Sequence, residues 1–249
     1  MEEMQDIRFL EHLEQLRRVL IKILGFTAFA ALPCWFLAPY ILDFLLSYAA
    51  PAGFKLHYFS LMEPFLVRLK ITCLLAVVIT LPLNGFLLWN FIAPGLLEDE
   101  RKAVRGPAVF MALLALGGTA LSAFLVIPAL IRFSLTFAGE NMQPVIGIGD
   151  FTDLVLTVLL AGMILFQFPV VLYFLLWLGI LDVAAVKDKR PLMIVLIFVA
   201  AAVLSPPDAF SQIVLAVPAW LLFELSLWFF SKRFSGRDRS YDEIYKDIE

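Results

Sequence analysis

The sequence predicts an all-α integral membrane protein with six kinked transmembrane helices, and three observations lead to this prediction. Hydrophobic residues make up 62% of the 249 positions and charged residues 16%, with a mean hydropathy of +0.91. A soluble globular protein has about 25% charged residues, so this chain has too little polar surface to coat a globule of its size. Several uncharged runs reach the roughly 20 residues that a helix needs to cross the bilayer core. The basic residues also gather in alternate connections between these runs.

Four of the uncharged runs are long enough to span a membrane with room for tilt. Two further runs, near the C-terminus, are shorter, and only Asp208 separates them. We expect these two to form a short helical hairpin that turns at Pro206-Pro207, because proline lacks the backbone donor and its ring clashes with the preceding turn. The whole chain, 1–249, is then a single membrane domain. The predicted spans are residues 20–38, 71–90, 107–128, 154–178, 191–205 and 210–230.

The connections between the spans predict the orientation. With six crossings, 15 of the 19 Lys and Arg residues fall on one side of the membrane, and the positive-inside rule places that side in the cytoplasm. We therefore expect a multi-pass protein of the cytoplasmic (inner) membrane with both termini in the cytoplasm. The basic residues on the outer side are Lys55, Arg68, Lys70 and Arg132.

Most of the 14 prolines lie in or beside the predicted spans. The carbonyls that they free must be satisfied by neighbouring helices or side chains, because lipid offers no hydrogen bonds. We therefore expect kinked helices in a concave, glove-like arrangement that could hold a partner or substrate within the membrane. A general tolerance of membrane helices for proline explains the same pattern equally well.

Several kinds of chemistry are missing from the sequence. It contains no phosphate-binding loop, no H-E-x-x-H and no G-x-S-x-G motif. Its two histidines, His12 and His57, are assigned to opposite sides of the membrane and cannot form one site. Ionisable residues, which mark ion or proton paths, are almost missing from the middle of the spans. We therefore expect no enzyme activity, no metal, no cofactor and no nucleic-acid partner.

Polar residues of two kinds are candidates for function. Gln167 lies near the middle of the fourth uncharged run, where an amide needs a hydrogen-bond partner and serves packing or assembly as readily as function. On the cytoplasmic side, Glu14 and Gln15 precede the first span, and Glu100 lies in the first inner loop. Carboxylates on the basic side suit a cationic partner, arginine above all, because its planar fork pairs with them bidentately. Alternatively, Glu14 pairs with Arg18 at the i, i+4 spacing and the loop acids are solvated.

Motifs around these residues resemble those of the TatC family, the polytopic subunit of the twin-arginine (Sec-independent) protein translocase. The resemblance covers nearly the whole chain, in order, and is most specific in the SPPDAFSQ segment. The matching segments are residues 12–17 (HLEQLR), 63–65 (EPF) with Lys70, 91–96 (FIAPGL), 100–102 (ERK), 166–169 (FQFP), 189–191 (KRP), 205–212 (SPPDAFSQ), 216–218 (AVP) and 223–224 (FE).

The resemblance implies a receptor for the twin-arginine signal peptides of folded cargo. Such a receptor assembles with TatA- and TatB-type single-span proteins, as a homo-oligomer within a translocase complex in the lipid membrane, and the proton motive force drives transport. It also implies a signal-peptide site. The implied site residues are Glu14, Gln15, Arg17, Phe91 and Glu100.

Two residues depart from the family pattern, since Gln15 and Gln167 are amides where the family usually has glutamate. An amide still accepts a hydrogen bond, but without the strength of a charged pair. Gln167 would then offer a polar contact to a partner helix. The hairpin would thin the local membrane or dock a partner span through Pro206, Pro207, Asp208 and Gln212.

Two other functions compete with this interpretation. A small-solute transporter also has kinked helices around a cavity, but it predicts ionisable midplane residues and usually paired repeats, and the sequence shows neither. A divergent membrane scaffold without a transport role would explain the two glutamines equally well.

Overall fold

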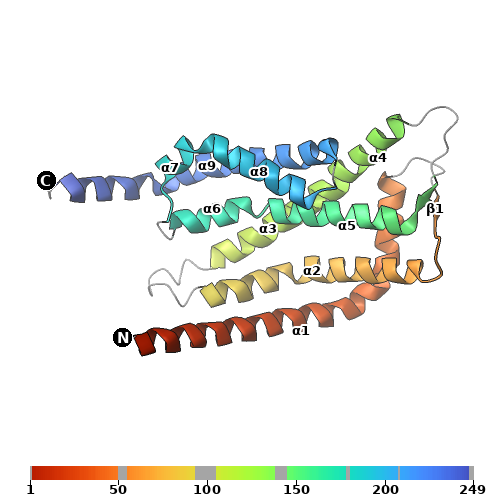
Figure 1. The fold of residues 1–249 in the computed structure, drawn as a ribbon, viewed down its shortest axis with the longest axis horizontal. Coiled ribbons are helices and arrows are strands. Elements are labelled where there is room, and N and C mark those ends of the chain that lie inside the picture. Colours follow the sequence, from red (N-terminus) through yellow and green to blue (C-terminus); the bar gives the residue numbers. More distant parts are fainter. Residues whose placement is uncertain are drawn as a thin grey trace. The chain divides into compact units, whose positions relative to one another are not determined.

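The computed structural model describes residues 2–49, 55–92, 105–137, 145–177, 180–206 and 208–246. Figure 1 shows that these residues are almost entirely helical, which confirms the all-α class. The elements are α1 (Glu2–Ala49), β1 (Leu56–His57), α2 (Glu63–Ile92), α3 (Arg105–Leu121), the π-helical η3 (Ser122–Val126), α4 (Ile127–Thr136), β2 (Ile146–Gly147), α5 (Ile148–Leu165), α6 (Phe168–Trp177), α7 (Val183–Asp188), α8 (Arg190–Leu204) and α9 (Ala209–Lys246).

Apolar helices dominate the described chain, as expected for an integral membrane protein. Five segments are long and apolar enough to cross a membrane, and each overlaps one predicted span: Leu13–Tyr48, Glu63–Leu88, Val109–Thr136, Ile148–Trp177 and Ala209–Lys232.

The remaining predicted span, 191–205, coincides with α8, an apolar helix of 15 residues. At about 1.5 Å per residue, α8 is about 22 Å long, shorter than the ~30 Å hydrocarbon core. Six crossings and the orientation of the termini therefore stay predictions.

Several prolines lie where a helix bends or breaks. Figure 1 shows that α1, which contains Pro33 and Pro39, changes direction along its length. Pro128 follows the π-helical turn, in which the backbone N–H of Ile127 donates to the carbonyl of Ser122, five residues earlier. Pro169 follows the break between α5 and α6. Kinked helices, as predicted, are present in the described chain.

The helices form two compact units, and each unit is built from two stretches of the sequence. The first comprises residues 1–116 and 143–156, and the second comprises residues 117–142 and 157–249. In the first unit α1 packs along α2. A small core of Ala38, Val67 and Ile71 lies where the bent part of α1 meets α2 and the start of α5.

In the second unit α8 packs on α9, and α6 and α7 also contact α9. Within α9, side chains such as Phe223 and Leu227 are fully buried. At the start of this unit the helices pack through small residues instead of large ones. Gly118 of α3 and Gly162 of α5 approach each other backbone to backbone.

Candidate functional site

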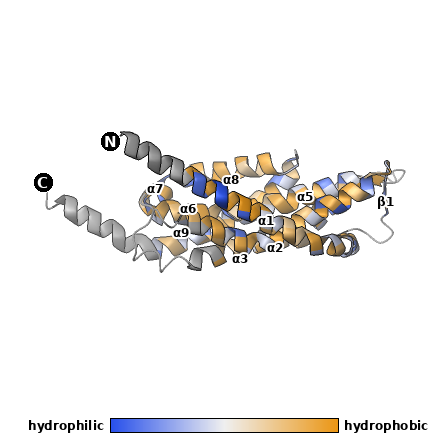
Figure 2. Ribbon diagram, turned by 90° about the horizontal axis from the view of Figure 1, so that it is seen from below, coloured by the Kyte–Doolittle hydropathy of each residue, from blue (hydrophilic) through white to orange (hydrophobic). Residues whose placement is uncertain are grey.

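The predicted signal-binding residues of α1 lie on an exposed part of the helix. Glu14, Gln15 and Arg17 are all exposed, and Figure 2 shows hydrophilic residues here and hydrophobic ones farther along α1. Glu14 Oε1 accepts a 2.7 Å hydrogen bond from Arg18 Nη2. The i, i+4 pair considered as the alternative is therefore formed. Both partners are more than half exposed, so the pair is weak and a competing cation can replace Arg18.

Hydrogen bonds between α1 and α2 fix how the two helices are aligned. Asn84 Nδ2 donates to the hydroxyls of Thr27 at 3.3 Å and Thr80 at 3.0 Å, and the two hydroxyls are 3.2 Å apart. This polar cluster was not predicted from the sequence. A threonine and an asparagine inside two apolar runs are the signal that could have revealed it, since such side chains bond across membrane helices.

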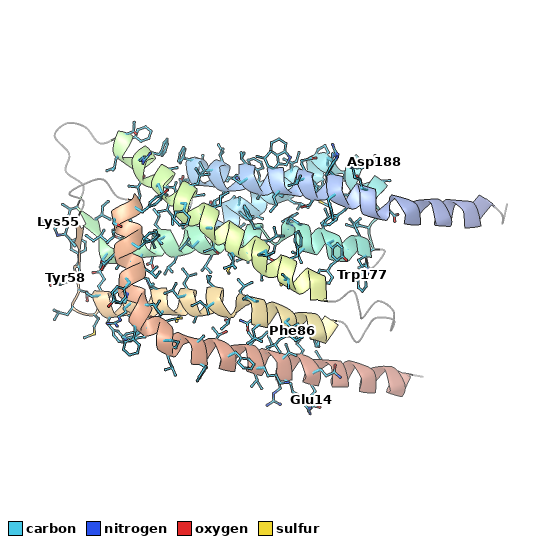
Figure 3. All side chains as sticks on the ribbon, turned by 180° about the vertical axis from the view of Figure 1, so that it is seen from behind. Glu14, Lys55, Tyr58, Phe86, Trp177 and Asp188 are labelled. Atoms are coloured by element: carbon cyan, nitrogen blue, oxygen red, sulfur yellow. The ribbon has the colours of Figure 1, made fainter. Side chains whose placement is uncertain are left out.

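This alignment brings Gln15 and Phe91 to the same end of the α1–α2 pair. From the Thr27–Asn84 contact, at 1.5 Å per residue, Gln15 lies about 18 Å toward the start of α1 and Phe91 about 10 Å toward the end of α2. Figure 3 shows Glu14 and Phe86 toward this end. The segment that follows Ile92 therefore starts close to the level of Gln15. Glu100, in that segment, lies outside the described residues.

Gln167 lies at the break between α5 and α6. Its backbone N–H donates to the carbonyl of Ile164, three residues earlier, at 2.9 Å. The side-chain Nε2 of the same residue donates to the carbonyl of Met163 at 3.3 Å. The side-chain amide thus bonds to the carbonyl four residues earlier, at the helix break just ahead of Pro169. A contact of Gln167 with a partner helix stays a prediction.

The predicted hairpin between α8 and α9 is built by its polar residues. Asp208 precedes α9 and caps it, because its Oδ1 accepts from the backbone N–H of Ser211 at 2.6 Å and its Oδ2 accepts from the Ser211 hydroxyl at 2.6 Å. Gln212 Nε2 donates to the carbonyl of Phe198 in α8 at 3.1 Å. Pro206 accepts from the N–H of Asp208 at 2.7 Å, while Pro207 lies outside the described residues. All of these contacts fix the turn.

We expect Asp208→Ala to destabilise the hairpin by about 1 kcal/mol, the usual cost of a lost N-cap. Asp208→Asn keeps a cap acceptor and should retain most of the stability. The melting temperature of the purified chain in detergent, measured for both variants, checks this. Equal losses in the two variants would show that the charge of Asp208, and not the cap, matters.

The best-connected polar cluster of the first unit lies at the opposite end of α2. Glu63 Oε2 accepts from the backbone N–H groups of Phe59 at 2.7 Å and Ser60 at 3.2 Å, and its Oε1 accepts from Gly149 at 2.8 Å. Beside it, β1 and β2 pair in parallel, and Lys70 Nζ lies 2.5 Å from Asp153 Oδ1.

The sequence analysis used Glu63 only as part of a motif, although Ser60-x-x-Glu63 is the capping-box spacing and could have revealed the role of its carboxylate. Among the described residues, no group of three or more His, Cys, Asp and Glu side chains could hold a metal ion. The apolar helices, their proline breaks and the capped hairpin define the class: a helical integral membrane protein with several candidate spans.

Comparisons with known proteins narrow the class to a family. The family model for the Sec-independent protein translocase protein (TatC) matches residues 11–218. The chain is 33% identical to the Sec-independent protein translocase protein TatC of Azotobacter chroococcum mcd 1, over 90% of this chain and 89% of that protein. It is also 33% identical to the TatC of Escherichia coli K12, over 78% and 74%.

Among solved structures, the crystal structure of the twin-arginine translocase receptor TatC in DDM superposes with a TM-score of 0.78 at 26% identity, covering 88% of this chain and 98% of that one. The chain therefore belongs to the TatC family. It is a membrane component of the Sec-independent protein translocase.

Proposed function

We propose that the chain is the receptor subunit that binds the paired arginines of twin-arginine signal peptides. Family membership over residues 11–218 carries the proposal, and a solved relative is titled a twin-arginine translocase receptor. The alignment of α1 with α2 supports it, because Gln15 and Phe91 lie at one end of the pair, where the segment with Glu100 begins.

The residues at this end suit a guanidinium partner. Glu14 is exposed and pairs with Arg18, so an arginine of the signal can take the place of Arg18 on the carboxylate. Gln15 offers a neutral amide oxygen, and Glu100 would supply the charge-assisted bond that an amide cannot. Phe91 would contact the apolar part of the signal. Arg17 is exposed on the same stretch of α1 and belongs to the proposed site.

The proposed assembly follows from the same family. TatA- and TatB-type single-span proteins and further copies of this chain would surround it in the cytoplasmic membrane, with both termini in the cytoplasm and transport driven by the proton motive force. Gln167 and the hairpin with Pro206, Pro207, Asp208 and Gln212 are the proposed polar contacts for partner spans. The contacts within the hairpin keep its turn rigid, which supports docking.

We expect Glu100→Ala to lower the export of a folded reporter with an RR signal at least tenfold, about the size of one lost charge-assisted hydrogen bond. The neighbouring Asp99→Ala, which removes the same charge from the same loop, should export normally. Export is measured in a bacterium that lacks its own TatC and expresses this chain with its cognate partners, and a KK signal serves as the blank.

Normal export by Glu100→Ala, or equal losses in the Glu100 and Asp99 variants, would contradict the proposed site. Stable expression of the wild-type chain without any RR-dependent export, even with its cognate partners, would favour the scaffold. Uptake of a small solute in place of reporter export would favour the transporter.

A further inference from the structure

Pro39 leaves the backbone carbonyl of Trp35, in the bend of α1, without its helical donor. Pro39 lies inside α1, and proline has no N–H to donate to the carbonyl four residues earlier, which belongs to Trp35. Lipid offers no replacement. A membrane helix with an interior proline therefore needs a donor from a neighbouring helix, a side chain or an ordered water.

Arg68 of α2 supplies a donor to this carbonyl. Its Nε donates to the carbonyl oxygen of Trp35 at 3.1 Å, and its Nη2 donates to the same oxygen at 2.9 Å. A carbonyl oxygen has two lone pairs, so it can accept both bonds from the guanidinium fork. Because the donor is charged, these bonds are roughly twice as strong as neutral ones. The gap that Pro39 leaves in the helix is thus filled from the next helix.

The indole of Trp35 also holds the guanidinium. Arg68 Cζ lies 4.5 Å from the centre of the Trp35 ring, within the range of cation–π attraction. Phe65, one turn earlier on α2, meets the same indole with its ring centroid 5.8 Å away, in an edge-on geometry. Arg68 is itself half-buried. Its charge is therefore compensated by a carbonyl and by a π face, which accounts for a basic residue on the predicted outer side.

We propose that Arg68 is a positioning residue that takes the place of the missing Pro39 N–H and thereby fixes the bend of α1. The bend keeps Ala38 packed on Val67 and Ile71 of α2 and sets the direction in which α1 leads toward β1 (Figure 1). The inference goes beyond the proposed function, since it concerns the shape of α1 with or without a signal peptide.

The first test replaces Arg68 with methionine, which has a similar length and no donors. Burying a charge in a membrane is costly, so a residue without a role should be neutral or stabilising when replaced in this way. We expect Arg68→Met to destabilise the bend of α1 instead. Spin labels at Leu24→Cys and Ser47→Cys, on either side of the bend, should show a broadened distance distribution in the full chain with Cys34→Ala and Cys73→Ser. Export of an RR reporter should fall about tenfold.

A double-mutant cycle ties the effect to the carbonyl of Trp35. Pro39→Ala returns a backbone N–H to this carbonyl, so Arg68→Met should cause no further broadening and no further loss of export in that background. Pro33→Ala is the matched control in the same helix. It returns an N–H to the carbonyl of Phe29, and the full effect of Arg68→Met should remain.

Equal effects of Arg68→Met in the wild-type and Pro39→Ala backgrounds would overturn the proposal, as would a distance distribution in Arg68→Met as narrow as in the wild type. If the Pro39→Ala chain does not accumulate, Arg68→Lys decides. Lysine keeps the charge and a donor but lacks the planar fork, so the proposal requires a result between those of Arg and Met. A lysine variant no better than methionine overturns it. The distance measurement uses the chain alone, so a failure of signal binding leaves it readable.

Discussion

Replacing Gly118 with alanine should destabilise the chain by about 3 kcal/mol or more, at the upper end of what overpacking costs. A Cβ at this position would lie 2.3 Å from the carbonyl oxygen of Gly162 and 2.9 Å from its carbonyl carbon. Both atoms are backbone, so no side chain can rotate away. Replacing Gly162 with alanine is unfavourable too, because its Cβ would overlap the hydroxyl of Ser122.

The close contact between Gly118 of α3 and Gly162 of α5 matters more in a membrane than it would in water. Lipid tails are as apolar as leucine, so helices associate through close packing and hydrogen bonds, and small residues let the backbones approach. Gly118 and Ser122 are four residues apart and form a small-xxx-small pair that faces Gly162. A single methyl group would separate the two helices along this contact.

The neighbouring Gly117 provides the matched control, because a Cβ there would meet nothing within 4 Å. Gly117→Ala should be neutral or stabilise the chain by up to about 1 kcal/mol through helix propensity. The melting temperature in detergent and the monodispersity on size-exclusion chromatography distinguish the two variants. Equal stability of Gly118→Ala and the wild type would mean that α3 and α5 do not meet in this way.

Glu63→Ala should detach β2 and the start of α5 from the start of α2. The substitution removes the acceptor of three backbone N–H groups from two distant segments, so the hydrogen bonds that join these segments through the carboxylate are lost. Hydrogen exchange should rise sharply at Phe59, Ser60 and Gly149. Peptide-level exchange of the purified chain measures this directly.

Two variants sharpen this experiment. Glu63→Gln retains only one acceptor oxygen, so it should protect either Gly149 or the Phe59–Ser60 pair, but not both. Asp153→Asn breaks the neighbouring ion pair with Lys70, whose side chains are 42% and 58% exposed, and exposed pairs contribute about 1 kcal/mol at most. Exchange that stays at wild-type levels in Glu63→Ala would refute the role given to the carboxylate.

Composition and run length were enough to predict the membrane class and the positions of most helices, since the bilayer imposes both. They could not predict that α1 continues for 48 residues. A proline normally argues for a helix end, and the donor that allows α1 to continue past Pro39 comes from Arg68, 29 positions farther along. The two-residue pairing of β1 with β2 is likewise set by tertiary contacts, because segments this short have no detectable alternation.

The candidate site was predictable to a different degree in each of its parts. Charge made Glu14 and Gln15 candidates, but the whole set, with Arg17, Phe91 and Glu100, was implied by the family resemblance, and its role in binding stays a prediction. The placement of the α1 residues beside the end of α2 follows from antiparallel helices. The local roles of Gln167 and Asp208 were not predicted. The role of Gln167 depends on a backbone N–H that bonds three residues back, and the role of Asp208 as a cap depends on where α9 begins. Neither of these is visible in hydropathy.

The Glu63 contact also constrains how the protein is made. Its two partners at Phe59 and Ser60 are synthesised just ahead of it, whereas Gly149 follows 86 residues later. The chain between them passes through residues 117–142, which belong to the other unit. During translation the first unit therefore cannot be completed until residues 117–142 of the second have been synthesised. A chain truncated before Gly149 would lack residues of both units and the third hydrogen bond of the Glu63 carboxylate.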